Sequence, residues 1–304
     1  MSESPEDDLL SSVLNAYQLH AGVYGHPQFC GIWQYGSSGN KRAAFHLVGR
    51  GQCWLHMRGT RDAVTLEGGD LVVFPHDAWH MLTGSPELHG DENLMVMDGD
   101  GPFTTLICGY FEFAAGDKNP VLDALPEVIV VRREDAGRHL EIIGQLLLEE
   151  ASTEGVGTRT VLDKLADTLF VMVVREYIKH CGDQRGVLAA LADLRLRKAL
   201  GAMHRDSAAA WTLETLAQTA GMSRASFTQR FSDVVGTTPI EYLTRWRMTQ
   251  AELLLRDPHI SVATAAERVG YETEAAFRKA FKRVHGVGPG SFRRWFRERI
   301  GGSA

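Results

Sequence analysis

Histidine and cysteine side chains in the first half of the sequence could bind a metal ion or undergo oxidation. The histidines concerned lie close together along the chain, and they are His46, His56, His76 and His80. The cysteines are Cys30, Cys53, Cys108 and Cys181. They form no CxxC pair and no finger-like spacing, so a structural zinc module is not expected. The cysteines are either packing residues or reactive sensors, and the histidines are either ligands or groups bonded to neighbouring backbone.

Basic and amide side chains in the last third of the sequence could bind a polyanion. Residues 191–304 hold 18 Lys/Arg and 11 Asp/Glu, a net charge of +7, while the whole chain carries −6. The remaining residues therefore carry −13. This asymmetry predicts that only the last third approaches a polyanion such as DNA.

Two near-copies of one helical unit position these side chains. The segment SRASFTQRFSDVVGTTPIEYL, which starts at Ser223, matches TEAAFRKAFKRVHGVGPGSFR, which starts at Thr273, at an offset of 50 residues. Each copy predicts a helix, a tight turn at glycine and a second helix. The predicted helix caps are Thr212, Ser223, Thr238, Ser261 and Thr273. A capping box at Thr238–Glu241, with proline at the first helical position, predicts a long helix to about Arg256.

The phenylalanines of each second helix predict which face is buried. Phe227 and Phe231 in the first copy, and Phe277 and Phe281 in the second, recur at helical spacing. The opposite faces present Arg224, Ala225, Thr228 and Gln229, and then Glu274, Ala275, Arg278 and Lys279. Such side chains can contact base edges in a major groove. The basic groups suited to phosphates are Lys282, Arg283, Arg293 and Arg294.

The first half of the chain predicts a β-sandwich or barrel followed by helices. Its strand-like runs are 41–49, 52–58, 70–74, 94–97 and 104–113, separated by turns such as Gly68-Gly69, Asp98-Gly99 and Asp100-Gly101. Apolar residues at helical spacing predict helices over 138–152 and 159–181, and a shorter helix covers about 191–204. The pattern breaks near Cys181–Gly186, where we expect a boundary.

The composition is that of a globular protein of two domains. No run approaches the roughly 20 apolar residues that a membrane helix needs, and the start, MSESPEDDLL, is acidic where a signal peptide is basic. We therefore expect a cytoplasmic location and no membrane partner. Stable disulfides are not expected in such a reducing compartment.

Residues 191–296 resemble the DNA-binding domain of the AraC/XylS-type regulators. The matching stretches are LAQTAGMSRASFTQRFSDVVGTTPIEYLTRWRMTQAELLL and ATAAERVGYETEAAFRKAFKRVHGVGPGSFRRW. The resemblance implies two helix-turn-helix units joined by a long helix, reading adjacent major grooves of double-stranded DNA. By position, the implied base-contacting residues are Ala225, Thr228, Gln229, Ala275, Arg278 and Lys279.

The first half resembles the cupin-like N-terminal domain of one branch of these regulators. GDLVVFPHDAWH, residues 69–80, matches the second cupin motif, with Asp77 where glycine is usual. The first cupin motif, which supplies two histidines and a glutamate as metal ligands, is missing. We therefore expect no cofactor and no metal, with the histidines bonded to neighbouring backbone. The alternative is a metal-dependent cupin enzyme, which would need a ligand set that the sequence lacks.

The resemblance implies a transcription regulator, more specifically an activator acting with RNA polymerase. Cys30 and Cys108 coincide with two cysteines of a branch that senses oxidising or electrophilic stress, so they, with His46 and His80, are the candidates for redox or effector sensing. Cys53 and Cys181 are interpreted as structural. Residues 159–181 resemble a dimerisation element, which implies a homodimer; packing of this helix on its own barrel is the alternative.

The sequence thus predicts an α+β protein of two domains. A cupin-like β-barrel is expected over residues 1–135, a helical dimerisation or linker region over 136–186, and an AraC-type DNA-binding domain over 187–304.

Overall fold

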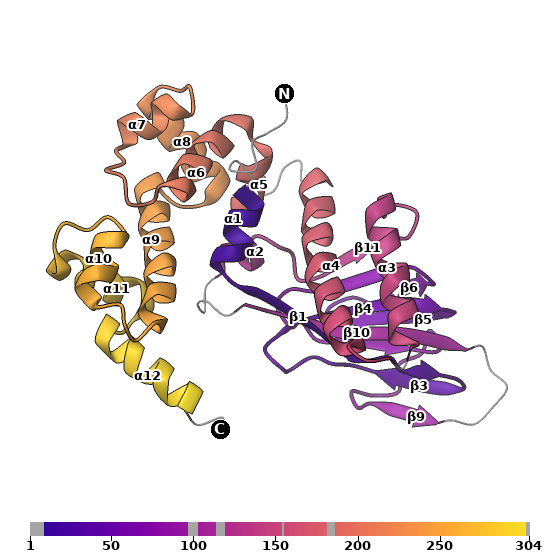
Figure 1. Ribbon diagram of the computed structural model, residues 1–304. Helices are drawn as coiled ribbons and strands as arrows, with labels where there is room; N and C mark the ends of the chain where they lie inside the picture. Colours follow the sequence, from indigo (N-terminus) through magenta and orange to yellow (C-terminus); the bar gives the residue numbers. More distant parts are fainter. Residues whose placement is uncertain (1–8, 97–102, 114–118, 154, 181–185, 302–304) are drawn as a thin grey trace. The chain divides into compact units, whose positions relative to one another are not determined.

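The computed structural model describes residues 9–96, 103–113, 119–153, 155–180 and 186–301 (Figure 1). Contacts divide the chain into two compact units, each described by its own packing. The sheet unit comprises residues 19–112 and 125–180, and the helical unit comprises residues 1–18, 113–124 and 181–304. The predicted α+β class is confirmed. Cys181 and the predicted turns at residues 98–101 lie outside the described residues.

Within the described residues, the strands of the sheet unit form two sheets rather than one closed barrel. One sheet has the order β1-β10-β4-β7-β11, with β2 also paired to β10, and the other has the order β6-β5-β8-β3-β9. The bounds are β1 Leu19–Gly25, β2 Gln28–Phe29, β3 Ile32–Tyr35, β4 Ala43–Arg50, β5 Gln52–Met57, β6 Val64–Glu67, β7 Leu71–Phe74, β8 His80–Thr83, β9 Leu94–Val96, β10 Thr104–Phe113 and β11 Ile129–Val131.

The core of the sheet unit contains side chains from both sheets. Leu55 and Leu82 from one sheet, and Phe74 and Leu106 from the other, are fully buried in one cluster. Side chains alternate between the two faces of a strand, so Cys108 shares this inner face with Leu106.

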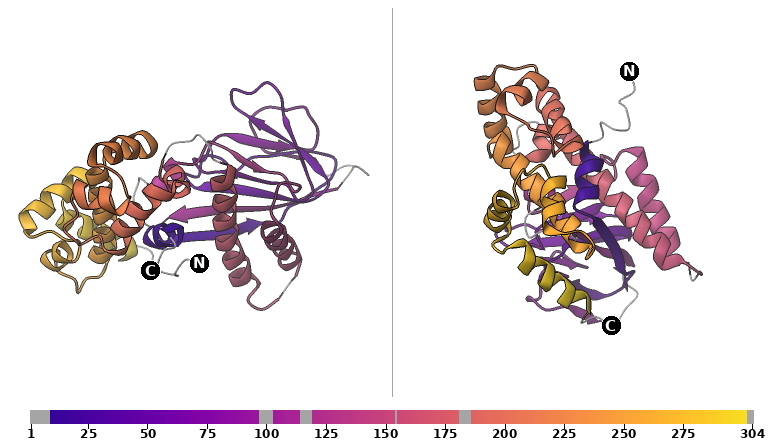
Figure 2. Two further views of the ribbon diagram at one scale, coloured as in Figure 1. Left: turned by 90° about the horizontal axis from the view of Figure 1, so that it is seen from above. Right: turned by 60° about the vertical axis from the view of Figure 1, so that its left-hand side comes forward.

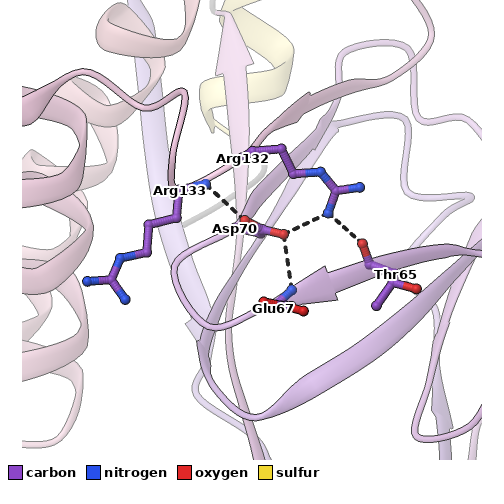
Figure 3. A network of polar contacts seen from close by, with 5 residues as sticks. All are labelled: Thr65, Glu67, Asp70, Arg132 and Arg133. Carbon is purple, nitrogen blue, oxygen red and sulfur yellow. Dashed lines mark hydrogen bonds and ion pairs between the residues drawn. The ribbon is translucent and has the colours of Figure 1, made fainter.

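A buried carboxylate fixes the end of β11 to the turn before β7. Asp70 Oδ2 lies 2.7 Å from Arg132 Nη1 and accepts a hydrogen bond from Glu67 N, while Asp70 Oδ1 accepts one from Arg133 N (Figure 3). Arg132 also donates to the carbonyl oxygen of Thr65. These bonds satisfy a carboxylate that would otherwise be costly to bury.

Two helices pack against the six-stranded sheet of this unit. They are α3 (Arg138–Ala151) and α4 (Thr158–His180), which lie side by side on one side of the strands (Figure 2). Helix α4 packs on β1, and its Phe170 ring lies 4.7 Å from the Phe111 ring of β10. The buried face of α4 therefore packs on the sheet of the same chain.

The helical unit contains the two predicted helix pairs joined by a long helix. Its elements are α1 Leu9–Ala16, α2 Pro120–Asp123, α5 Val187–Ala192, α6 Leu194–Arg205, α7 Leu213–Thr219, α8 Arg224–Val235, α9 Pro239–Arg256, α10 Val262–Arg268, α11 Glu274–His285 and α12 Pro289–Gly301. Each of the five predicted caps accepts a backbone N–H through its side chain. In the part of the chain described, no helix is long and apolar enough to span a membrane.

Only one of the two hydrogen bonds of the capping box predicted at Thr238 is formed. Thr238 Oγ1 accepts from Glu241 N at 3.3 Å. The Glu241 carboxylate instead accepts from Arg245 Nη2 at 2.6 Å, one turn further along α9. A complete box occurs at α7, where Thr212 and Thr215 cap each other. An arginine at the i+4 position competes for the glutamate, which the sequence pattern alone does not reveal.

The first described helix, α1, belongs to the helical unit. Helix α1 packs on α6 and α9. The Tyr17 hydroxyl lies 3.2 Å from Thr249 Oγ1, and the Tyr17 ring lies 6.3 Å from that of Trp246. Burial of Leu9, Val13 and Leu14 holds α1 to these helices. The helical unit is therefore built from stretches that are far apart in the sequence.

Candidate nucleic-acid interface and buried histidine cluster

Helix α8 exposes the face that the sequence assigns to DNA. Its capping residue is Ser223, and it ends at Gly236 with φ of 81°, the left-handed conformation that glycine adopts without strain. Phe227 and Phe231 are fully buried. The predicted contact residues therefore lie outward: Arg224, Ala225 and Gln229 are exposed, and Thr228 is half-buried.

Two of these side chains already have intrahelical partners. Gln229 Nε2 donates to Asp233 Oδ1 at 2.8 Å, and Thr228 Oγ1 donates to the carbonyl of Arg224 at 2.9 Å. Both bonds are at the surface, where their net free energy is small. A base edge can therefore replace the Gln229 contact at little cost.

Helix α11 repeats this arrangement with more positive charge. Thr273 caps it, Gly286 ends it with φ of 75°, and Phe277 and Phe281 are fully buried. The outward side chains are Glu274, which is half-buried, and the exposed Ala275, Arg278, Lys279, Lys282 and Arg283. Arg278 pairs with Glu274 one turn earlier, at 2.5 Å between Nη2 and Oε1. This ion pair holds the Arg278 guanidinium beside Glu274 on the outward face of α11.

The Arg293 side chain donates hydrogen bonds to backbone carbonyls of the helical unit. Its Nε donates to the carbonyl of Leu255, and its Nη2 donates to the carbonyl of Ile260. The guanidinium thereby ties α12 to the end of α9 and the turn that follows. Its neighbour Arg294 is exposed, so it remains suited to phosphates.

A second polar cluster lies inside the sheet unit. His46 on β4 and Cys108 on β10 are directly opposite each other in the strand register, and His46 Nδ1 lies 3.1 Å from Cys108 Sγ. His80, the first residue of β8, comes from the other sheet, and its Nε2 lies 3.0 Å from His46 Nε2. All three side chains are fully buried. The structure therefore brings together three of the four predicted sensing residues.

Ser37 completes this cluster, and no sequence pattern indicated it. Its Oγ lies 3.2 Å from His46 Nε2 and 3.2 Å from His80 Nε2. We call these three atoms, Ser37 Oγ, His46 Nε2 and His80 Nε2, the histidine triangle. Ser37 lies in the turn between β3 and β4, so only the folded chain places it beside the two imidazoles.

Asp77, which replaces the usual cupin glycine, anchors the turn that carries Ser37. Its backbone has φ of 56°, the left-handed region that glycine favours and that aspartate tolerates better than most residues. Its carboxylate accepts hydrogen bonds from Gly39 N at 3.0 Å and from Lys41 N at 2.6 Å. Aspartate at this position therefore supplies a carboxylate that accepts two backbone hydrogen bonds, which glycine could not accept.

Burial keeps the groups of this cluster uncharged. It lowers the pKa of His46 well below its ordinary value, and the neighbouring His80 lowers it further. Burial also lowers the pKa of His80 and raises the pKa of the Cys108 thiol. The imidazoles are therefore neutral near pH 7, which is the form that binds metal ions.

Cys30 lies away from Cys108. Phe29 of β2 is opposite Thr104 of β10, and Cys108 is four residues further along that strand. At about 3.3 Å per residue, Cys108 is at least roughly 13 Å from this end of β2, whereas a disulfide needs Cα atoms within about 7 Å. Cys30 and Cys108 therefore cannot form a disulfide in this conformation.

The other predicted residues have structural contacts. His56 Nε2 lies 3.0 Å from Thr83 Oγ1, and His76 Nε2 lies 2.9 Å from the carbonyl oxygen of Leu125. Cys53 is fully buried in the core of the sheet unit. Among the described residues, no group of three or more His, Cys, Asp and Glu side chains is placed to hold a metal ion.

Comparison with known proteins agrees with both halves of this description. Residues 8–179 match a cupin family, and residues 216–295 match a helix-turn-helix domain family. A putative AraC-like transcription regulator from Streptomyces lividans is 31% identical over 95% of this chain and 98% of its own length. The chain belongs to the AraC-like transcription regulators. This AraC-like regulator is thus a DNA-binding protein with a cupin domain, and nothing in the comparisons favours the enzyme alternative.

The matches to other relatives also cover most of the chain. An uncharacterized HTH-type transcriptional regulator from Haemophilus influenzae is 30% identical over 94% of this AraC-like regulator and 98% of its own length. The RCS-specific HTH-type transcriptional activator RclR from Escherichia coli is 30% identical over 84% of this chain and 85% of its own length.

Proposed function

We propose that this AraC-like regulator is an activator that reads DNA with α8 and α11 and responds to an oxidant or small electrophile at Cys108. It acts as a homodimer and contacts RNA polymerase. The observation that carries the signal assignment is the position of Cys108 Sγ, 3.1 Å from His46 Nδ1 in the buried core of the sheet unit.

The two outward faces support sequence-specific DNA binding. Gln229 on α8 and Lys279 on α11 are exposed in the N-terminal half of each helix, the half that contacts base edges when such a helix enters a major groove. Lys282 and Arg283 are exposed one turn later and suit phosphates. Ala225 and Ala275 allow close approach and can touch a thymine methyl group.

Oxidation of Cys108 would change the packing between β10 and β4. A peroxide transfers one oxygen atom to the sulfur as its O–O bond breaks, so that R–SH and H₂O₂ give R–SOH and H₂O. Cys108 is fully buried, and an added atom in a well-packed core forces neighbours to move. The relative RclR is named as an RCS-specific transcriptional activator, which supports the activator role.

The role of Cys30 in this proposal is separate from that of Cys108. Cys30 is half-buried and therefore more accessible to an electrophile than Cys108. Because the two sulfurs lie too far apart for a direct disulfide, each thiol is modified on its own unless the strands move.

Helix α3 supplies the dimer contact of this proposal. Its buried side packs on the sheet, whereas Ile142 and Leu146, one turn apart, are 40% and 44% exposed. An apolar pair at this spacing is suited to the same pair on a second copy. A dimer would place two DNA-reading domains on one repeated site and raise their effective concentration.

Measuring promoter activation in cells that carry single cysteine variants tests whether these thiols detect the signal. We expect Cys108→Ser to abolish induction by oxidants and Cys30→Ser to weaken induction by electrophiles. Cys53→Ser is the matched control, because Cys53 is equally buried but lies outside the histidine cluster. Unchanged induction in both Cys30→Ser and Cys108→Ser would show that the signal enters elsewhere.

A further inference from the structure

We infer that Arg247 is a positioning residue that sets the spacing and the relative rotation of the two DNA-reading helices, α8 and α11. The protein thereby selects duplexes by the number of base pairs between the two halves of a site, and not only by the bases within each half. The inference rests on the proposed reading of DNA by α8 and α11, and it is independent of any signal at Cys108.

Helix α9 is shared by the two helix pairs, of which the first is α7 with α8 and the second is α10 with α11. Near the start of α9, the Tyr242 ring lies 5.8 Å from the Phe231 ring of α8. Further along, Met248 and Leu255 are fully buried in one core with side chains of α10 and α11. Contacts away from the axis of α9 resist relative rotation of the two pairs more strongly than contacts close to it.

The Arg247 side chain binds the loop that leads into the first helix pair. This loop, residues 206–212, joins α6 to α7. Arg247 Nε donates to the carbonyl oxygen of Ser207 at 2.6 Å, and Arg247 Nη2 donates to that of Ala209 at 2.8 Å. Because a guanidinium is planar and its donors are fixed relative to one another, these two bonds hold both the position and the direction of the loop.

The same guanidinium contacts the turn that leads into α11. It lies 5.8 Å from the centroid of the Tyr271 ring, which is within the range of a cation–π contact. Tyr271 packs on the core of the second helix pair, and its ring lies 5.7 Å from that of Phe277 on α11. Arg247 therefore links the segment before α7 to the segment before α11 through one side chain.

The backbones of this loop and this turn also approach each other closely at Gly270. A Cβ atom at Gly270 would lie 2.4 Å from the carbonyl oxygen of Ala208 and 2.8 Å from its Cα. Gly221 occupies the equivalent turn of the first pair, with φ of 65° against 79° at Gly270, and a Cβ there would meet no atom of the described residues within 4 Å. Both turns favour glycine for its conformation, but only the second of them also lies against another segment.

These contacts, which we call the Arg247 joint, hold α8 and α11 at one separation and one relative rotation. Successive major grooves on one face of a duplex are about 34–36 Å apart. One extra base pair between two half-sites shifts one half by about 3.4 Å and rotates it by about 34–36° around the duplex axis. Two readers joined rigidly then lose contacts or deform the DNA, whereas two readers joined flexibly can follow the displaced half-site.

Titration of the full chain on two duplexes tests the Arg247 joint. One duplex carries a site mapped by sequencing bound genomic fragments, and the other carries the same site with one base pair inserted between its halves. We expect the wild type to bind the second duplex at least about tenfold more weakly, and Arg247→Met to reduce this ratio to about threefold or less. Arg247→Lys, which keeps the charge without the planar pair of donors, should give an intermediate ratio.

Arg245→Met is the matched control for charge. It removes an arginine from the same helix whose partner is Glu241, one turn earlier, rather than the loop before α7. This variant should keep the wild-type ratio between the two duplexes. A change that only removes a phosphate contact or destabilises the fold lowers both affinities alike, so the ratio separates positioning from either effect.

Two alanine variants test the joint without removing any charge. Gly270→Ala and Gly221→Ala place a Cβ in equivalent left-handed turns, but only Gly270→Ala pushes against Ala208. We expect the ratio to fall in Gly270→Ala and to stay at the wild-type value in Gly221→Ala. An unchanged ratio in both Arg247→Met and Gly270→Ala, or a wild type that binds both duplexes equally, would overturn the inference alone. Absence of any preferred site would contradict DNA reading by α8 and α11, and the inference with it.

Discussion

His46 and Cys108 face each other across two neighbouring strands, with Nδ1 and Sγ 3.1 Å apart and both side chains fully buried. A polar pair of this kind is costly in an apolar core unless each group is satisfied. The pair is continued by His80 and Ser37, so the sheet unit has one connected polar cluster at its centre. Signal detection is proposed to act at this cluster.

Alanine substitutions at the adjacent residues Arg293 and Arg294 are expected to have different effects, one on stability and the other on DNA binding. Arg293→Ala removes hydrogen bonds to two backbone carbonyls and should destabilise the helical unit by about 1–3 kcal/mol. Arg294→Ala, on an exposed side chain, should leave stability unchanged and weaken DNA binding. Chemical denaturation and DNA titration of both variants check this pair. The assignment fails if Arg293→Ala is as stable as the wild type.

Asp77 is expected to hold the Ser37 turn through its carboxylate. Asp77→Gly relieves a left-handed backbone, worth roughly 1 kcal/mol, but removes the acceptor for Gly39 N and Lys41 N. Overall stability should therefore change little, while amide hydrogen exchange at residues 39 and 41 rises several-fold. Asp77→Asn keeps an acceptor oxygen and serves as the control. Equal protection of these amides in Asp77→Gly and the wild type would contradict the role.

The stability of the helical unit is expected to fall in mild acid because of His204. Its ring stacks on Trp246 at 3.7 Å, and burial lowers its pKa from 6.5 to about 3. The unfolded chain therefore binds a proton that the folded chain excludes, so stability is lost as pH falls below about 6.5, by up to about 1.4 kcal/mol per pH unit.

His204→Phe keeps the stacked ring without the titration. Hydrogen exchange of peptides from α6 and α9, compared at pH 7.5 and 5.5, should show a smaller loss of protection in this variant than in the wild type. His259→Phe, at an exposed position, is the control. The same pH dependence in all three proteins would rule out His204 as its source.

The dimer contact is expected to depend on the outer face of α3. Leu146→Glu places a charge on a side chain that is 44% exposed, so it should leave folding intact and shift the protein to monomers. Sedimentation velocity measures this shift. Val287→Glu changes a similarly exposed apolar side chain, 45% exposed, outside α3 and is expected to leave the oligomeric state unchanged. A persistent dimer in Leu146→Glu would place the contact elsewhere.

Local patterns account for the parts that the sequence predicted well. The helix pairs have a cap, a turn glycine and two phenylalanines within about a dozen residues, and all of these act over short distances. The strands over 104–113 and 52–57 are long and apolar enough to be recognised from the sequence. The outward faces of α8 and α11 follow directly from which side the phenylalanines bury.

The remaining features depend on contacts between distant residues. Ser37 meets His46 and His80 only because strands of two sheets meet at the cluster, and Arg293 finds its carbonyl partners only after α12 folds back on α9. Helix α1 is short, and its partner helices lie more than 170 residues away in sequence. Periodicity within one segment contains no information on such pairings.

The central claim, that α8 and α11 read bases, is tested most directly by sequencing genomic fragments bound by the full chain and titrating the enriched site. Gln229→Ala and Lys279→Ala should each weaken binding to that site by about 1–3 kcal/mol and leave binding to random duplex nearly unchanged. Lys198→Ala, on an exposed residue of α6, is the charge control. Equal losses on every duplex, or no enriched site at all, would contradict the claim.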